Sequence, residues 1–573
     1  MTDSEVRSFS FDSQQVDAFR NDDARLTNWP VVYTLNDRKQ VYVGETINAV
    51  ARMRQHLDSP AKQGLTCMRI VLNERFNKSV CLDLESHLIR LLSGDGALEV
   101  INRNEGITDA EYFDRASYLR RFDDVFDQLR EEGLFTRPVA EIENSDLFKY
   151  SPFKALNPDQ ALAVHDIVDG ILEALDKEEA STSVISGEPG TGKTIVAVFL
   201  IKLLRDIASM SDNDEPDRDS VFADLFTPDV RDRFNGLRIG FVVPQQSLRK
   251  TVRNVFKRTP ALAAPMVVSP FDVGADEEEY DLLIVDEAHR LTQRSNQASG
   301  PQNTKYREIT EKLFGFDDTS RTQLDWIKAK SRHRIFMLDA AQSIRPGDLP
   351  QALLSDLELE AQAFRRKFRL RTQMRVHAGE NYIGYIDDIV HARPTERKSF
   401  RDYELCLYTD LPEMIRAVHR REEESGLSRI LAGYAWPWRT KKDPSDFDIV
   451  IGDVKLRWNG RLVDWVNSPT SLNEAGSIHT IQGYDLNYAG VIIGRDLRYD
   501  PATDRMYFDR QNYHDSKGME NNRVLGISYT DDDLLSFVQN IYKVLLTRGI
   551  RGTFVYAEDP AMSAYLERFF PTA

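Results

Sequence analysis

Short apolar segments alternate with amphipathic ones over residues 29–108 of the chain. Short apolar stretches with polar flanks are typical of strands, whereas apolar residues that recur every three or four positions indicate helices. The predicted strands are Val31 to Leu35, Val41 to Val43 and Met68 to Leu72, and the predicted helices are Ala49 to Leu57 and Leu82 to Leu92. This pattern predicts a small mixed α/β unit.

From residue 151 onward, near-continuous apolar strands alternate with longer helical patterns. Strands that are apolar on both faces are typical of parallel sheets covered by helices on both sides. One series contains TSVISG, RIGFVVP, YDLLIVDE and HRIFMLD, and a second contains SRILAGYAW, AGVIIG and GTFVYAE. The sequence therefore predicts an α/β fold in which two parallel-sheet lobes follow the small unit.

The same patterns suggest domain boundaries. We expect an N-terminal extension at residues 1–28, the small α/β domain at 29–108 and a charged helical linker at 109–150. The first parallel-sheet lobe is predicted at 151–350 and the second at 351–573.

Composition excludes several classes of protein. The 573 residues are 41% hydrophobic and 29% charged, as in soluble globular proteins, and contain no apolar run long enough to span a membrane. The N-terminus has no basic region followed by an apolar stretch, so we expect a cytoplasmic protein with no membrane partner. Cys67, Cys81 and Cys406 are too few and too scattered for a disulfide framework or a zinc site.

The charge balance limits how the chain can meet nucleic acid. A net charge of −17 argues against coating nucleic acid by bulk charge, because phosphates would repel the chain. Two segments nevertheless concentrate basic residues, SLRKTVRNVFKR at 247–258 and FRRKFRLRTQMR at 364–375. Either segment alone is typical of a solvated helix face, but two of them in an acidic chain favour a track for phosphates.

A glycine-rich loop carries the strongest chemical signal. GEPGTGKT matches the phosphate-loop pattern in the context that supports it, because a buried strand precedes the loop and an apolar helix follows. Glycines at 187, 190 and 192 let backbone N–H groups face the phosphates, and the helix N-terminus adds partial positive charge. We expect Gly187, Gly190, Gly192 and Lys193 to bind ATP and the Thr194 hydroxyl to hold Mg²⁺.

An acidic pair completes this predicted site. The apolar strand LLIV ends in Asp286 and Glu287, about ninety residues after the loop. We predict that Asp286 binds Mg²⁺ and that Glu287 orients or activates the attacking water.

Further segments resemble the motifs of superfamily 1 helicase or translocase ATPases over residues 150–560. They are LNPDQ, VVPQQSLRKTV, MLDAAQSIRPGD, LRTQMR, SIHTIQGYDLNYAGVIIG and YKVLLTRGIRG. The resemblance implies two RecA-like lobes with ATP in the cleft between them, and nucleic acid as the partner. It assigns adenine recognition to Gln160, γ-phosphate sensing to Gln342, a nucleotide contact to Arg375 and an arginine finger to Arg548. The wording of the second lobe is closest to the Schlafen-type ATPases.

The small N-terminal domain resembles a GIY-YIG nuclease domain. The second triplet is nearly intact as Tyr42-Val43-Gly44, and the first survives as the tyrosine of Val31-Val32-Tyr33. Arg52 follows eight residues after the glycine, and His56 shares a helix face with it. A helix bearing Glu85 and a turn bearing Asn102 complete the ordered set.

The resemblance implies hydrolysis of a phosphodiester with one divalent metal, Mg²⁺ or Mn²⁺. Glu85 would bind the metal, and Tyr33 or Tyr42 would act as the general base or assist it. Arg52 would steady the scissile phosphate, and His56 and Asn102 would complete the site. A hard cation takes carboxylate oxygen, and the charge of the pentacoordinate phosphorus calls for a fixed cation nearby.

These features lead to one main hypothesis and two alternatives. The main one is an ATP-dependent enzyme that joins a metal-dependent endonuclease to a superfamily 1 motor and acts on DNA, in DNA processing or antiphage defence. One alternative is an ATP-switched DNA-binding regulator or sensor whose nuclease domain is inactive. The other is an enzyme with RNA as its substrate.

Overall fold

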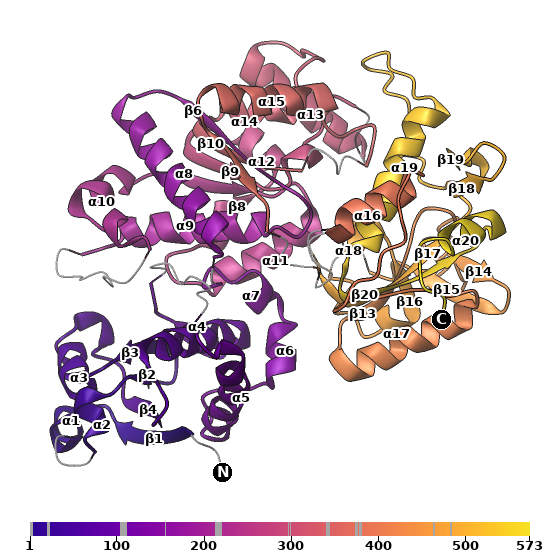
Figure 1. Ribbon diagram of the computed structural model, residues 1–573. Coiled ribbons are helices and arrows are strands. Elements are labelled where there is room, and N and C mark those ends of the chain that lie inside the picture. The colour runs from indigo at the N-terminus through magenta and orange to yellow at the C-terminus, as the bar shows by residue number, and fades with distance from the viewer. Residues whose placement is uncertain are drawn as a thin grey trace. The chain divides into compact units, whose positions relative to one another are not determined.

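The computed structural model describes residues 4–573 apart from 20–22, 104–111, 155, 212–220, 296, 298, 340–343, 373–375, 377–380, 462–463 and 482–483. The chain forms two compact units, each described here by itself (Figure 1). The first unit comprises Met1–Val168, Ile195–Gly236 and Val252–Ala264, and the second comprises Asp169–Thr194, Leu237–Thr251 and Pro265–Ala573.

The first unit is built on a mixed sheet with the strand order β1-β4-β2-β3-β5. Its strands are β1 (Ser4–Ser10), β2 (Val31–Asn36), β3 (Gln40–Thr46), β4 (Cys67–Asn73) and β5 (Glu99–Val100). The β2–β3 pair is an antiparallel hairpin, and β5 runs parallel to β3. The strands predicted from the apolar pattern are thus confirmed. The N-terminal segment that the sequence suggested as a separate extension supplies an edge strand, because β1 pairs with β4.

Helices cover both faces of this sheet. Tyr33 and Leu35 point to one face, where they pack with α3 (Ala49–Leu57), while Val32 points to the other and packs with α4 (Lys78–Asp95). Two other short helices are α1 (Ser13–Ala18) and α2 (Arg25–Asn28). The side chain of Asn77 caps the start of α4, and Gly96, with a left-handed φ of 64°, ends it.

The segment predicted as a linker is part of this core. Helix α5 (Arg115–Glu131) buries Phe122, Val125, Phe126 and Leu129 in the same cluster as α4. Its apolar residues at three- and four-residue spacing therefore mark a packed face and not a connector between domains.

The second unit contains two parallel sheets, as the sequence predicted. The first lobe has the strand order β11-β6-β10-β9-β7-β8, with every pair parallel. Its strands are β6 (Ser181–Gly187), β7 (Ile239–Val242), β8 (Val267–Val268), β9 (Tyr280–Val285), β10 (Ser331–Leu338) and β11 (Lys367–Leu370). Because β11 pairs with β6, the first lobe extends past the predicted boundary at residue 350.

The second lobe has the order β12-β20-β17-β13-β16-β15-β14, parallel except for the β14–β15 pair. Its strands are β12 (Glu404–Leu407), β13 (Ser428–Ala432), β14 (Ile449–Ile451), β15 (Val454–Trp458), β16 (Glu474–Gly476), β17 (Leu486–Ile493) and β20 (Gly549–Ala557). A separate hairpin joins β18 (Leu497–Asp500) to β19 (Arg505–Phe508). The α/β fold class with two parallel-sheet lobes is confirmed.

Further helices lie before, between or after these strands along the chain. They are α6 (Val139–Glu143), α7 (Asp146–Lys149), α8 (Pro158–Asp176), α9 (Lys193–Ala208), α10 (Pro228–Phe234), α11 (Gln246–Lys257), α12 (Pro270–Ala275), α13 (Gly300–Phe314), α14 (Gln323–Ala329), α15 (Gln351–Ala363), α16 (Asn381–Val390), α17 (Leu411–Ser425), α18 (Ile478–Ile481), α19 (Asp531–Leu546) and α20 (Pro560–Leu566). Within the described ranges, none of the helices combines the length and the apolar content needed to cross a bilayer.

Candidate functional site

The loop after β6 has the backbone of a phosphate-binding loop. Gly190 and Gly192 have φ values of 85° and 81°, a conformation that residues with a side chain rarely adopt. A side chain at Gly187 would meet the hydroxyl of Thr191. Because α9 begins directly after the loop, at Lys193, its N-terminal N–H groups point toward the place where phosphates would bind.

Lys193 is held inside this loop by backbone oxygens. Its Nζ donates to the carbonyl of Gly187 at 2.6 Å and to that of Glu188 at 3.0 Å, and it lies 3.7 Å from Asp339 Oδ2. The ammonium is thus a positioned, nearly buried cation. Such a group suits the β- and γ-phosphates of a nucleotide.

Thr194 and Asp286 meet as the sequence predicted. Thr194 Oγ1 donates to Asp286 Oδ2 at 2.8 Å. A hydroxyl and a carboxylate side by side fit Mg²⁺, which takes oxygen ligands and keeps its remaining positions for water and phosphate. Burial and the adjacent charge of Glu287 raise the pKa of Asp286 above its ordinary value.

Glu287 follows β9 in a left-handed conformation, with φ of 48°. Its Oε2 lies 3.0 Å from Nε2 of the fully buried His289. Burial opposes ionisation, but His289, Lys193 and Arg290 outweigh it and lower the pKa of Glu287. The ionised carboxylate can accept a hydrogen bond from a water molecule, which is the role predicted for it.

The other residues predicted for the ATP site are placed separately. Gln160 caps its own helix, since its Oε1 accepts from Asn157 N at 3.1 Å and its N donates to Asn157 Oδ1 at 2.9 Å. Arg548 is buried between α19 and β20 in the second lobe, with Nη1 3.5 Å from Tyr484 O. The roles assigned to Gln160 and Arg548 stay predictions. Gln342 and Arg375 lie outside the described residues.

Polar contacts join the two lobes of the second unit. Thr251 Oγ1, in α11 of the first lobe, is 3.1 Å from the hydroxyl oxygen of Tyr484. The backbone carbonyl oxygen of the same Tyr484 contacts Arg548. Arg345, which follows β10, lies 3.3 Å from Asp515 Oδ2 and also contacts His479. Thr251, Tyr484, Arg345 and His479 all belong to segments that resemble superfamily 1 motifs.

A cavity of about 540 Å³ lies beside these contacts within the second unit. Its lining includes the basic residues Arg249, Arg290, Lys305, Arg345 and Lys517, several glutamine, asparagine and serine side chains, and the carboxylates Asp272, Asp348 and Glu520. Arg249 is anchored by donating Nη1 to the carbonyl oxygens of Val243 at 2.7 Å and Pro244 at 3.1 Å. Basic and amide side chains around an open cavity suit a nucleic-acid backbone.

In the first unit, the structure gathers four of the predicted nuclease residues, Tyr33, Tyr42, Arg52 and His56, into one cluster. Tyr33 Oη lies 2.7 Å from His56 Nε2, and Arg52 Nε donates to Tyr33 Oη at 3.4 Å. The ring of Tyr42 is 5.2 Å from that of His56. Lys62, at the end of a single 3₁₀ turn (Pro60–Lys62), lies 2.9 Å from His56 Nδ1 and 3.5 Å from the centre of the Tyr42 ring. We call these residues, Tyr33, Tyr42, Arg52, His56 and Lys62, the tyrosine cluster.

The cluster determines the tautomer of His56. An ammonium can only donate, so Nδ1 must accept from Lys62 and the ring proton must be on Nε2. Burial, with the positive charges of Lys62 and Arg52, lowers the pKa of His56 to about 2. His56 is therefore neutral and donates Nε2–H to Tyr33, whose phenol oxygen also accepts from Arg52.

The ionisation of Tyr33 is governed by opposing effects. Burial, followed by the nearby Tyr42, raises its pKa well above 10, while Arg52 lowers it and Glu85 raises it further. At neutral pH the side chain is a phenol that already accepts two hydrogen bonds. Those two donors would stabilise the phenolate once a proton left.

Gly44 makes room for this arrangement. The hairpin register pairs Tyr33 with Gly44, and a side chain on Gly44 would collide with the phenol oxygen of Tyr33. The glycine of the YVG triplet is therefore required by close approach across the strands.

Glu85 brings negative charge near the cluster, since it contributes to the raised pKa of Tyr33. Glu85 and Glu45, after burial, raise the pKa of the Cys81 thiol. Mg²⁺ is commonly held by one or two carboxylates plus substrate phosphates, so a single carboxylate such as Glu85 fits it. No group of three or more His, Cys, Asp or Glu side chains suited to a metal occurs in the parts of the chain that the structure describes.

Asn102 has a structural contact. Its Nδ2 donates to Val43 O at 2.8 Å, and its Oδ1 accepts from Val43 N at 3.0 Å. Because Val43 follows Tyr42, these two hydrogen bonds fix the backbone that carries Tyr42. Asn102 therefore positions β3.

Sequence reasoning missed several members of these sites. Lys62 belongs to the nuclease candidate, and Asp339 and His289 belong to the ATP candidate. His289 follows the acidic pair by two residues, so its position carried a signal. Lys62 lies in no motif, and only the fold brings it to His56.

Comparison with known proteins adds independent information. An uncharacterized protein of Saccharomyces cerevisiae is 26% identical over 423 residues, which cover 69% of this chain and 85% of that protein. Among solved structures, the helicase nonstructural protein 10 of an arterivirus aligns with 69% of this chain and 64% of its own, at 12% identity and a TM-score of 0.28. A Pif1 helicase solved in a study of forked double-stranded DNA aligns with 70% of this chain and 93% of its own, at 10% identity and a TM-score of 0.26.

The family comparison covers both lobes. The model of the Schlafen group 3 DNA/RNA helicase domain matches residues 180–559 of the 573, which include the phosphate loop, the acidic pair and Arg548. A helicase-like ATPase function on nucleic acid follows for this part of the chain, and the family implies ATP and Mg²⁺ as its ligands. The chain belongs to the Schlafen group 3 DNA/RNA helicase family.

Proposed function

We propose that this protein is an ATP-driven nucleic-acid enzyme in which the motor of the second unit serves a metal-dependent endonuclease in the first unit, with DNA as the substrate. The tyrosine cluster carries the nuclease part of the proposal. Its residues come from separate elements, β2, β3, α3 and the 3₁₀ turn after α3, yet their polar atoms converge on the Tyr33 hydroxyl and the His56 ring. Tyr33 and His56 are buried and hydrogen-bonded to each other in a way that a merely structural hairpin does not need.

The residues can divide the chemistry of phosphodiester hydrolysis among them. The phenolate of Tyr33, which two hydrogen-bond donors stabilise, would take a proton from the attacking water and become the phenol. Arg52, a fixed cation beside that oxygen, would hold the scissile phosphate and balance its growing charge. A divalent metal bound through Glu85 would supply Lewis-acid stabilisation of the phosphate oxygens.

The motor part of the proposal goes beyond what family membership establishes. Lys193, Thr194 and Asp286 would bind Mg²⁺-ATP, and Glu287 would orient the attacking water. The contact between Thr251 and Tyr484, next to Arg548, would carry closure of the lobes from the nucleotide to the nucleic acid. The cavity lined by Arg249 and Arg345 would hold the strand. A role in DNA processing or antiphage defence is consistent with the fusion of a nuclease domain to an ATP-driven motor.

One incubation series tests this function. The full chain is incubated with plasmid, linear DNA or RNA, with Mg²⁺ or Mn²⁺, and with or without ATP. Cleavage of DNA should be lost in Glu85→Ala and retained in the matched control Glu74→Ala, an exposed glutamate of the same unit. Lys193→Ala should lose ATP hydrolysis, and cutting at the wild-type rate by this variant would show that the activities are not coupled.

Two results would reject parts of the proposal. Absence of cleavage on every substrate by wild-type protein would remove the nuclease. Cleavage of RNA in preference to DNA would remove the proposed substrate while leaving the chemistry in place.

A further inference from the structure

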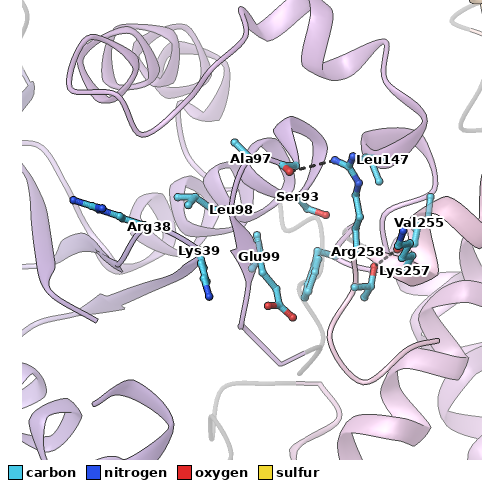
Figure 2. A pocket seen from close by; sticks show the side chains of 14 residues that line it. Arg38, Lys39, Ser93, Ala97, Leu98, Glu99, Leu147, Val255, Lys257 and Arg258 are labelled. Carbon is cyan, nitrogen blue, oxygen red and sulfur yellow. Dashed lines mark hydrogen bonds between the residues drawn. The ribbon is translucent and has the colours of Figure 1, made fainter. Parts of the chain in front are cut away.

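A cavity of about 380 Å³ lies within the first unit, lined by residues other than those of the tyrosine cluster. One wall is the β2–β3 turn with Arg38 and Lys39, and another is the end of α4 and the start of β5, residues 93–100. The C-terminal end of α11, with Lys257 and Arg258, forms the opposite wall. In the view of Figure 2, Arg38 and Lys39 lie to one side of Glu99, and Lys257 and Arg258 lie to the other.

The charge of this lining is opposite to that of the chain. Arg38, Lys39, Lys257 and Arg258 are all exposed to solvent, whereas the protein as a whole carries a net charge of −17. Among the described residues that line the cavity, Glu99 is the only acidic one. Its Oε2 accepts a hydrogen bond from Gln40 Nε2 at 3.3 Å. The excess of positive side chains gives the cavity a local positive potential that attracts anions.

Part of the wall is held in place by backbone contacts. Arg258 Nη1 donates to Gly96 O at 3.3 Å, and a side chain on Gly96 would approach Leu147 and this guanidinium to within 3 Å. Glu99 N donates to Lys39 O at 2.7 Å, which ties the turn to β5. A guanidinium has five N–H donors, so the anchor to Gly96 leaves donors that can face a ligand.

The arrangement of the cations favours a strand over a single small anion. Arg253 and Lys257 are four residues apart and both exposed, so they share one face of α11, and Lys257 at the end of this face lines the cavity. On the other wall, Lys39 precedes Tyr42 of the tyrosine cluster by three residues, about 10 Å along an extended strand. Cations repeated along a path match the repeated phosphates of a nucleic-acid backbone.

We propose that this cavity binds the phosphodiester backbone of the nucleic-acid strand on which the protein acts, close to the tyrosine cluster. The inference rests on the proposed function for the presence of a nucleic-acid substrate. It does not depend on cleavage, because it concerns binding alone.

The test measures binding by the full chain without cleavage. A fluorescein-labelled single-stranded 20-mer is titrated in EDTA, without ATP, over a series of salt concentrations. Arg38→Ala/Lys39→Ala should weaken binding about five- to tenfold at low salt and should reduce the slope of log K against log salt by about 1.4, since two phosphate contacts are lost. Lys257→Ala should give a smaller change of the same kind.

A matched control separates the cavity from general charge. Arg120→Ala/Arg130→Ala removes two exposed arginines of α5 in the same unit, outside the cavity lining, and should leave affinity within about twofold. Equal losses in both double variants would overturn the cavity proposal. Displacement of the 20-mer by inorganic phosphate or pyrophosphate at 1 mM would also overturn it, because the site would then be one for small anions.

The outcomes also distinguish this proposal from the proposed function. Strand binding that is unaffected by the cavity variants refutes the cavity alone. Failure of the wild-type chain to bind any nucleic acid refutes both. Weakened binding in the cavity variants supports the inference even if the protein cuts nothing.

Discussion

Tyr33 Oη and His56 Nε2 lie 2.7 Å apart inside the first unit, with the imidazole ring held on its other side by Lys62. The three side chains form a hydrogen-bonded row in which the direction of each proton is set by the ammonium at its end. Such a row places a neutral histidine as donor to a buried phenol.

Lys62 acts through His56, so its loss should change the tautomer. Lys62→Met keeps an aliphatic chain against the Tyr42 ring but removes the donor to Nδ1. We expect DNA cleavage to fall roughly 10- to 100-fold, because Tyr33 loses a fixed donor. The ¹⁵N chemical shifts of His56 should show the proton moving from Nε2 toward Nδ1, whereas Lys442→Met, at an exposed lysine of the second unit, should change neither quantity. Unchanged shifts would contradict the assigned tautomer.

Gly44→Ala should disturb Tyr33 directly. The new methyl group would collide with the Tyr33 hydroxyl, so we expect a loss of about 1–3 kcal/mol in the free energy of unfolding and a marked loss of cleavage. Gly64→Ala is the matched control, because a side chain there meets nothing within 4 Å. Thermal denaturation and a cleavage assay of both variants provide the comparison, and equal behaviour of the two would refute the close approach.

The pH dependence of cleavage should reflect the raised pKa of Tyr33. Its pKa lies above 10 because of burial and Tyr42, so the phenolate fraction is small at neutral pH. If the phenolate is the base, the rate of the chemical step should rise about tenfold per pH unit between pH 7 and 9. Single-turnover cleavage over this range, with Tyr33→Phe for comparison, measures the effect. A flat profile would exclude Tyr33 as the base.

Burial of neutral His56 should make the first unit sensitive to acid. Its pKa falls from 6.5 to about 2 on folding, so below pH 6.5 the unfolded chain binds a proton that the folded chain does not. The contribution of His56 to the free energy of unfolding is fully present above pH 6.5 and is lost progressively as the pH falls toward 2. At pH 5 the loss from this group is about 2 kcal/mol. His56→Gln should therefore lose less stability between pH 7.5 and pH 5 than wild type, as measured by denaturant unfolding. An equal loss in both proteins would argue against a neutral buried histidine.

The contact between Thr251 and Tyr484 should couple the two lobes. The hydroxyls are 3.1 Å apart, and Tyr484 O also contacts Arg548. We expect Thr251→Val and Tyr484→Phe to be non-additive by about 1 kcal/mol in a double-mutant cycle on the rate of ATP hydrolysis stimulated by nucleic acid. Strict additivity would show that the hydrogen bond does not transmit the nucleotide state.

Several features of the fold were readable from local sequence. The apolar strands of both lobes and the helix Ala49–Leu57 follow from patterns with periods of two and of three to four residues, which depend only on neighbouring residues. The phosphate loop is equally local, since the left-handed glycines, Lys193 and Thr194 are adjacent in the chain. Asp286 could be paired with Thr194 because strand ends meet at one edge of a parallel sheet.

Other features depend on contacts between distant segments. The edge strand Ser4–Ser10 alternates in polarity too weakly for its sequence to predict the pairing with β4. The sequence of α5 is also compatible with a linker, and only the packing of Phe122 and Phe126 against α4 shows that it belongs to the core. Lys62 lies in no motif, and only the folded chain brings it to His56. Asp339 lies in the segment MLDAAQSIRPGD, but its proximity to Lys193 also depends on the fold.

The sequence by itself determined which residue types were available for each chemistry: a phosphate loop, an acidic pair, two tyrosines, an arginine and a histidine in order. Only the tertiary structure decided which of their atoms meet and that His56 is a neutral donor. It also shows that position 44 must be glycine because a larger side chain would collide with Tyr33. The physical reason is that tautomers, burial and close approach are properties of three-dimensional surroundings, whereas strand and helix periods and loop motifs are properties of the local chain.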